Sequence, residues 1–168
     1  MYKFLETLEA AAAPKFRQAH REFDRFTDDE RAFIAARDSF YLSTVAANGW
    51  PYIQHRGGPP GFLKVLDDTT LGFADYRGNR QYISVGNLAS NDRASLFLVD
   101  YPHRARLKIL AHARITEDPA VLQQVATPGG KAVVERAVIF ELVAFDWNCP
   151  QHITPRWTAE EIRHASGM

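Results

Sequence analysis

The sequence predicts a mostly β domain with flanking α-helices packed on its outside. Short segments rich in β-branched and aromatic residues recur between residues 40 and 147. The dipeptide Asn48-Gly49, a strong hairpin signal, separates the first two of these segments. Two Thr-x-x-Glu motifs mark helix starts toward the two ends of the chain. Many short strands with turn signals favour a barrel over a doubly wound parallel sheet.

The bulk composition narrows the class of protein. The 168 residues fit one domain, 1–168, without an evident linker or repeat. The 20 basic and 20 acidic side chains balance, so no overall field favours nucleic acid or an anionic membrane as a partner. A lone cysteine, Cys149, excludes a disulfide framework, and a buried structural role is favoured for it over a nucleophilic one. With no apolar run of about 18 residues and no signal peptide, we expect a cytoplasmic protein.

Helices are predicted at both ends and in two places between the strands. Residues 1–37 read as helical, with a helix that begins at the Thr27–Glu30 capping box and runs to about Arg37. A C-terminal arm and helix, 148–168, carries the second capping box, Thr158–Glu161. The two internal helices are expected at Arg80–Ser90 and Pro119–Ala126.

Seven strands are predicted between these helices. The hairpin of Phe40–Ala46 and Pro51–His55 is followed by Phe62–Leu66, Thr70–Ala74, Arg93–Tyr101, Arg106–Ile115 and Ala137–Trp147. From Arg104 to Arg114, basic residues alternate with apolar ones, which is typical of a strand with one face in solvent or in a ligand cleft.

The standard catalytic motifs are missing from the sequence. It has no phosphate-binding P-loop, no Gly-x-Gly-x-x-Gly turn, no His-Glu-x-x-His helix and no Gly-x-Ser-x-Gly elbow. The 6 histidines are scattered without metal-ligand spacing. We therefore expect no metal site.

One segment has the composition of a phosphomonoester site. Residues 74–88 read ADYRGNRQYISVGNL, and a helix that starts near Arg80 places Arg80, Ser84 and Asn87 on one face. A helix N-terminus offers free N–H groups, and the arginines at 77 and 80 add charge-assisted donors for a phosphate. Composition alone supports a solvated helix face with a basic turn equally well.

Two further segments carry polar groups in irregular chain. In HRGGPPGFLK, residues 55–64, glycines permit close approach of a ligand, while His55, Arg56 and Lys64 supply polar groups at the two ends of the loop. In NCPQHITPRW, residues 148–157, two prolines exclude regular structure and His152 and Arg156 bring polar groups. Each segment also fits an ordinary surface connection.

Taken in order, these stretches together with SNDRASLFLVDYP and RLKILAHARI resemble the FMN-binding split barrel of the pyridoxamine 5'-phosphate oxidase-related family, over roughly residues 40–156. The resemblance implies a six-stranded antiparallel barrel, assembled as a homodimer with FMN in two inter-subunit clefts. It implies that Arg56 and Gly57 approach the flavin ring or ribityl chain and Lys64 the phosphate or flavin edge. It assigns the phosphate cradle to Arg77, Asn79, Arg80, Ser84 and Asn87, and it brings Arg106 and His152 to the cleft.

The resemblance leaves several functions open. The first is an FMN-dependent oxidoreductase whose small-molecule substrate or electron donor is unknown. The second is a flavin-binding module without turnover of its own, such as a carrier, a sensor or an electron relay. The third is a haem-handling relative with His55, His112 or His152 as ligand. We do not expect an authentic pyridoxine phosphate oxidase, because the final residues, 158–168, lack the Arg-x-His segment with which that enzyme holds its substrate's phosphate.

Overall fold

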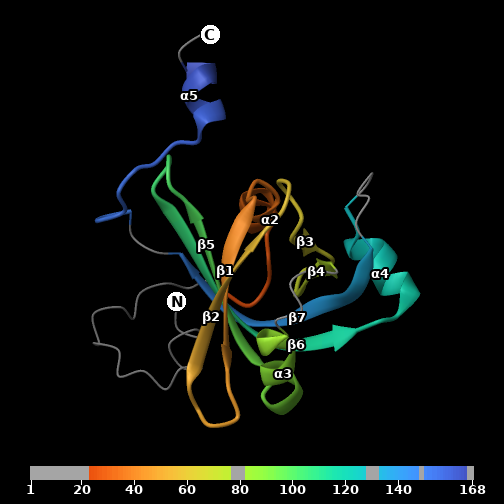
Figure 1. The fold of residues 1–168 in the computed structure, drawn as a ribbon. Coiled ribbons are helices and arrows are strands. Elements are labelled where there is room, and N and C mark those ends of the chain that lie inside the picture. Colours follow the sequence, from red (N-terminus) through yellow and green to blue (C-terminus); the bar gives the residue numbers. More distant parts are fainter. Residues whose placement is uncertain (1–22, 77–81, 128–132, 148–149, 166–168) are drawn as a thin grey trace.

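The computed structural model describes residues 23–76, 82–127, 133–147 and 150–165. Its centre is a seven-stranded sheet in the order β2-β1-β5-β6-β7-β4-β3, and every neighbouring pair is antiparallel (Figure 1). The strands are β1 (Ser39–Val45), β2 (Pro51–Gly57), β3 (Lys64–Val65), β4 (Thr70–Tyr76), β5 (Arg93–Asp100), β6 (Ala105–Thr116) and β7 (Val134–Trp147).

The mostly β fold class and all seven predicted strands are confirmed, although the bounds of the strands differ from the predicted ones by up to three residues. β3 has only two residues, and β7 begins three residues before the predicted Ala137. The resemblance implies six strands, whereas the sheet has seven because the short β3 pairs with β4 at its edge. On β6, the apolar Leu107, Ile109, Ala111 and Ala113 are buried and the residues between them are more exposed, so the predicted alternation is also confirmed.

The β1–β2 hairpin forms where Asn48-Gly49 predicts it. Gly49 has a φ of 87°, a conformation that glycine adopts without steric cost. The register pairs Phe40 with Arg56 and Tyr41 with His55. Because successive side chains of a strand alternate between its two faces, Phe40 points into the core and Tyr41 points outward.

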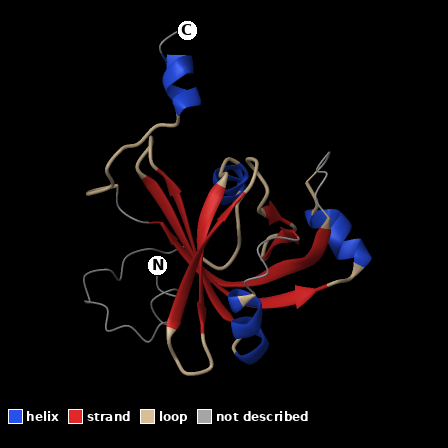
Figure 2. Cartoon of the chain, viewed as in Figure 1, coloured by secondary structure: helices blue, strands red, loops and turns tan. Residues whose placement is uncertain are grey.

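The described residues form four helices (Figure 2): α2 (Asp28–Ala35), α3 (Ile83–Ser90) and α4 (Pro119–Val125), which lie beside the sheet, and α5 (Ala159–Ala165), which projects away from it. Both capping boxes are present, with the Thr27 N–H 2.9 Å from Glu30 Oε2 and the Thr158 N–H 2.6 Å from Glu161 Oε2. The predicted start of α3 near Arg80 is wrong. The helix begins at Ile83, after a Tyr82 whose side chain is held by tertiary contacts.

The core fills the inside of the curled sheet. Phe40, Phe62 and Phe73 pack with ring centroids 5.6 to 6.4 Å apart, and Phe73 stacks in turn on Phe140 at 6.0 Å. Among the described residues, no helix has the length and apolar character needed to cross a membrane.

Candidate functional site

A cavity of about 270 Å³ opens where the two edges of the sheet approach each other. Its wall comes from the end of β2, from the loop that follows β2, and from β4. The lining residues are His55, Arg56, Gly57, Gly58, Pro59, Phe62, Phe73, Ala74, Asp75 and Tyr76. We call this space the Arg56 cavity. It gathers one cation, one carboxylate, aromatic rings and a glycine-containing loop at one place.

Arg56 is held at this cavity by one charge and one ring. Its Nη1 lies 3.3 Å from Asp75 Oδ1, and its guanidinium carbon lies 5.5 Å from the centre of the Phe73 ring. The Arg56 side chain is only 18% exposed. Its Nε is buried and has no hydrogen-bond partner among the described residues. Arg56 therefore has donor capacity that the described part of the chain leaves unused.

Asp75 links this arginine to a second one. Asp75 Oδ2 lies 3.5 Å from Nε of Arg136, on β7, and Arg136 Nη2 lies 3.0 Å from Glu135 Oε2. Burial lowers the pKa of Arg136, but the hydrogen bond that Arg136 donates to Glu135 and the charge of Asp75 outweigh it, so this pKa lies above its usual value. Arg136 is therefore a permanent cation in this network.

The network ends at Tyr82, immediately before α3. The Arg136 guanidinium carbon lies 4.7 Å from the centre of the Tyr82 ring, and the Tyr82 hydroxyl donates to Glu135 Oε2 at 3.3 Å. These contacts fix the chain at the point where α3 begins. The segment predicted to cradle a phosphate thus leads directly into a position held by side chains of β7.

Ser84 and Asn87 share one face of α3, as predicted, and both side chains are buried there. The Ser84 hydroxyl donates to Gln54 Oε1 on β2 at 2.9 Å, and Asn87 Nδ2 donates to Thr44 Oγ1 on β1 at 2.9 Å. Both side chains anchor α3 to the β1–β2 hairpin in this structure. Their predicted role as phosphate ligands stays a prediction.

The loop after β2 needs a glycine at position 58. A Cβ atom added to Gly58 lies 2.7 Å from Cγ and 2.8 Å from Cβ of Phe62, which is closer than atoms of folded proteins approach. Phe62 itself is buried against the core, so it cannot move away at low cost. The loop therefore packs tightly over Phe62 at the cavity wall.

The remaining predicted site residues lie elsewhere or outside the described residues. Lys64 lies on edge strand β3, Arg106 lies on β6 opposite Val99, and His152 is exposed on the C-terminal arm with a φ of 63°. None of these three lines the Arg56 cavity. Arg77, Asn79 and Arg80, as well as Cys149, are not among the described residues.

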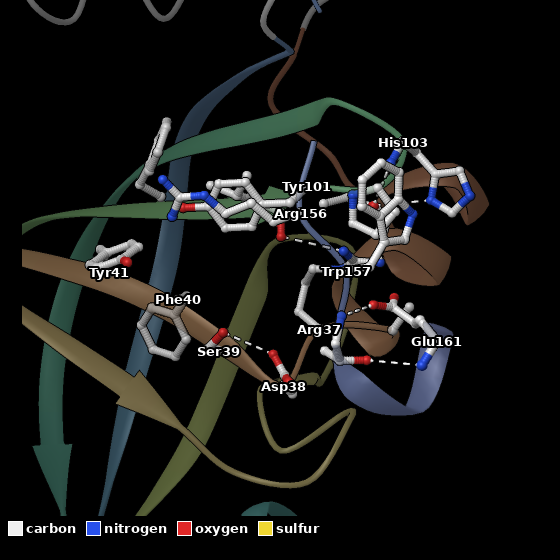
Figure 3. Close-up of a pocket in the computed structure, with 16 residues that line it drawn as sticks. Arg37, Asp38, Ser39, Phe40, Tyr41, Tyr101, His103, Arg156, Trp157 and Glu161 are labelled. Atoms are coloured by element: carbon white, nitrogen blue, oxygen red, sulfur yellow. Dashed lines mark hydrogen bonds and ion pairs between the residues drawn. The ribbon is translucent and has the colours of Figure 1, made fainter. Parts of the chain in front are cut away.

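A second cavity, of about 300 Å³, lies beside the C-terminal arm (Figure 3). It is lined by the residues that connect α2 to β1, the first residues of β1, the second half of β5 with the turn after it, and residues of the arm and α5. Asp100 at its edge is buried, with Oδ2 2.8 Å from Arg37 Nη2 and Oδ1 3.0 Å from His103 Nδ1. We call this space the His103 cavity.

The described residues contain no group of three or more His, Cys, Asp or Glu side chains able to hold a metal ion. His112 pairs with Asp92, its Nδ1 lying 2.9 Å from Oδ2. His55 contacts Tyr41 with ring centroids 5.6 Å apart. The described structure thus gives no clustering of the histidines that we considered as haem ligands.

Sequence reasoning missed Asp75, Tyr76 and the Phe62–Phe73 wall of the Arg56 cavity, and it missed the Asp100–His103 pair. Asp75 and Tyr76 stand next to Arg77 in the phosphate-like segment, so proximity to that segment was an available signal. Phe62 and Phe73 read as ordinary core residues. Only their position at the split between β2 and β4 distinguishes them.

Comparison with known proteins agrees with this architecture. Three solved structures share the fold at low sequence identity. HupZ of Group A Streptococcus has a TM-score of 0.59 and 17% identity over 79% of this chain and 99% of its own. An FMN-binding protein of Syntrophomonas wolfei has a TM-score of 0.51 and 17% identity, over 71% of this chain and 83% of its own. A Clostridium acetobutylicum protein related to general stress protein 26, of the pyridoxinephosphate oxidase family, has a TM-score of 0.54 and 16% identity, over 80% of this chain and 94% of its own.

No curated protein matches this chain. A family model does match, and it covers most of the sequence. Residues 26–155 match the model described as pyridoxamine 5'-phosphate oxidase. That span contains every strand of the sheet, including the start of β1, which lines the His103 cavity, and the end of β2, which lines the Arg56 cavity. The chain therefore belongs to the pyridoxamine 5'-phosphate oxidase-related family and has its FMN-binding split-barrel fold.

Proposed function

We propose that the protein binds FMN at the Arg56 cavity and acts as a flavin-dependent oxidoreductase on a small molecule. The observation that carries the proposal is the partly buried Arg56, whose Nε has no hydrogen-bond partner among the described residues, at the mouth of an aromatic-walled cavity. A planar ring with a phosphate tail needs apolar walls, a few directed donors and clustered cations. The Arg56 cavity offers the first two.

The chemistry of the lining residues fits this cofactor. Phe62, Phe73 and Tyr76 supply apolar and aromatic surface, and Arg56 supplies N–H donors for carbonyl or hydroxyl oxygens. Asp75 and Arg136 set the position of Arg56 and of the chain entering α3. We assign the phosphate to Arg77, Asn79 and Arg80, with Ser84 and Asn87 on the following helix. When bound, FMN supplies the electron-accepting ring, while the protein fixes its orientation and limits access to it.

We further propose that the protein is a homodimer. The β1–β2 hairpin exposes two large apolar side chains: Trp50, in its turn, is 73% exposed, and Ile53, on β2, is 65% exposed. β2 forms ladder hydrogen bonds with β1 alone, so the hairpin is an edge of the sheet. Exposed apolar side chains gathered on an edge hairpin are typical of an interaction surface. A cleft between two subunits also gives more space than the 270 Å³ of the Arg56 cavity.

The test is purification without added cofactor, followed by release of any chromophore and its identification by mass. We expect FMN at close to one per chain. The mass distinguishes FMN from riboflavin and from a deazaflavin. A protein that is colourless and that also fails to bind added FMN would contradict the binding proposal.

Turnover is tested separately on FMN-loaded protein. NADH and NADPH are mixed with it anaerobically, and the rate of flavin bleaching is compared with that of free FMN. Faster reduction of the bound flavin supports an oxidoreductase, and equal rates with every donor support a carrier or relay. Pyridoxine phosphate and pyridoxamine phosphate are tested in air. We expect no formation of pyridoxal phosphate at rates typical of enzymes, on the order of 1 per second or more.

A further inference from the structure

The His103 cavity contains a histidine that a buried carboxylate holds in one orientation. Asp100 Oδ1 lies 3.0 Å from His103 Nδ1 and also accepts the His103 backbone N–H at 3.0 Å. Arg37 fixes the same carboxylate from the other side, with Nη2 at 2.8 Å from Oδ2. When Nδ1–H donates to Asp100, Nε2 of the neutral ring becomes a hydrogen-bond acceptor directed away from the carboxylate. His103 lines the cavity, and its side chain is 81% exposed.

Aromatic side chains form much of the remaining wall. Tyr41 lies on β1, Tyr101 lies in the turn after β5, and Trp157 comes from the C-terminal arm (Figure 3). Phe97 adds a further ring from within β5. Tyr41 and Trp157 are 40% and 58% exposed, so apolar surface faces solvent on two sides of the cavity. Arg156 covers Tyr101, with its guanidinium carbon 5.0 Å from the ring centre. A flat aromatic ligand that enters the cavity would bury aromatic surface that is exposed to water without it.

The charges of the cavity select against an anion. Its lining includes three carboxylates, from Asp38, Asp100 and Glu161, against two guanidinium groups, from Arg37 and Arg156. Arg37 is already paired with Asp100. The excess of negative charge disfavours a phosphate monoester relative to a neutral ligand of the same shape.

The two cavities are neighbours across paired strands. Tyr41 and Ser39 line the His103 cavity, and their register partners on β2, His55 and Gly57, line the Arg56 cavity. The Tyr41 and His55 rings meet edge to face, with centroids 5.6 Å apart. A ligand in the His103 cavity therefore lies one strand away from the site that we assign to the cofactor.

We propose that the His103 cavity binds a small, uncharged, hydroxylated aromatic molecule, whose hydroxyl donates a hydrogen bond to His103 Nε2. That this molecule is the substrate rests on the proposed function, whereas its binding in the cavity is independent of that function. A volume of about 300 Å³ accommodates one or two fused rings. His103 holds the hydroxyl at a fixed position and is able to accept its proton.

The experiment uses 4-methylphenol as the probe at about pH 8, between the ordinary pKa values of an imidazole and of a phenol, so that both groups are uncharged. Binding is measured by equilibrium dialysis, with the free probe followed by its absorbance, on FMN-loaded and FMN-free protein. We expect saturable binding at one site per chain. His103→Gln should weaken it about fivefold to tenfold, the loss expected for one hydrogen bond. His112→Gln is the matched control, because His112 pairs with Asp92 in the same manner on β6 and does not line the cavity.

Two related probes sharpen the test. 4-Methylanisole has no hydroxyl hydrogen, so its affinity should be the same for wild type and His103→Gln. 4-Methylphenyl phosphate should bind more weakly than the phenol. Equal affinity of 4-methylphenol for wild type and His103→Gln overturns the proposal, as does tighter binding of the phosphate. If the protein fails to bind FMN, only the proposed function is overturned. The titration of FMN-free protein still tests whether the His103 cavity binds the phenol.

Discussion

Arg56 on edge strand β2 and Asp75 on β4 form an ion pair of 3.3 Å between strands that are five places apart in the sheet order. The pair shows that the sheet curls until its two edges nearly meet. Both side chains line the Arg56 cavity. The same contact therefore spans the split of the barrel and positions the cation that we assign to the cofactor.

Replacing Asp75 tests whether this contact holds the split together. Asp75→Asn leaves Arg56 and Arg136 close to each other without their shared counter-charge. Because these groups are 13% to 18% exposed, we expect a loss of about 1–3 kcal/mol in the free energy of unfolding by urea. Asp92→Asn is the control, since Asp92 is 60% exposed, and it should change stability by less than about 0.5 kcal/mol. Equal losses in the two variants contradict a special role for Asp75.

Arg80→Ala tests the assigned phosphate cradle. Removing a charge-assisted contact to a phosphate should weaken FMN binding by about 2–4 kcal/mol. Riboflavin, which has no phosphate, should be affected much less. Both affinities are measured by titration of cofactor-free protein, with Arg114→Ala, an exposed arginine on β6, as the control. An equal loss for FMN and riboflavin means that Arg80 has a structural role.

Ile53→Glu tests the proposed dimer face. Ile53 is 65% exposed on the outer face of β2, where a charge costs little in an isolated chain and much in a dry interface. We expect the wild type to sediment as a dimer and Ile53→Glu to shift toward the monomer without loss of β-sheet signal. Val133→Glu introduces the same charge at a 66% exposed apolar position outside the hairpin and should remain dimeric. A wild-type monomer at all concentrations rules out the dimer.

The ionised carboxylate of the buried Asp100 should make the free energy of unfolding sensitive to acid. Burial raises the pKa of Asp100, but the His103 backbone N–H and the Arg37 charge outweigh it and hold this pKa below the usual 3.8. A carboxyl with a lowered folded-state pKa stabilises the fold fully above its unfolded-state pKa. That stabilisation is lost as the pH falls through the folded-state value. The free energy of unfolding should therefore fall as the pH drops below about 4.

The comparison is between wild type and Asp100→Asn, each unfolded by urea over a series of acidic pH values. Asp100→Asn should be less stable near neutral pH and should lose less stability on acidification, because its side chain does not titrate. Parallel pH curves for the two proteins would show that Asp100 does not contribute to the acid sensitivity.

The sequence by itself determined the elements whose signals are local. Alternation of apolar and polar residues located β6, Asn48-Gly49 located the first hairpin, and Thr27 with Glu30 located the start of α2. Each of these depends on residues within a few positions of one another. The family model matches residues 26–155, a span that contains all of the segments that carry the resemblance.

Only the tertiary structure decided how the sheet closes and which side chains meet. Tyr82 is held by β7 residues more than fifty positions away, so α3 begins later than its own segment indicates. Arg56 meets Asp75 because β2 and β4, which are five places apart in the sheet order, come together when the sheet curls around its aromatic core. Such contacts depend on the packing of the whole sheet, and no short stretch of sequence encodes them.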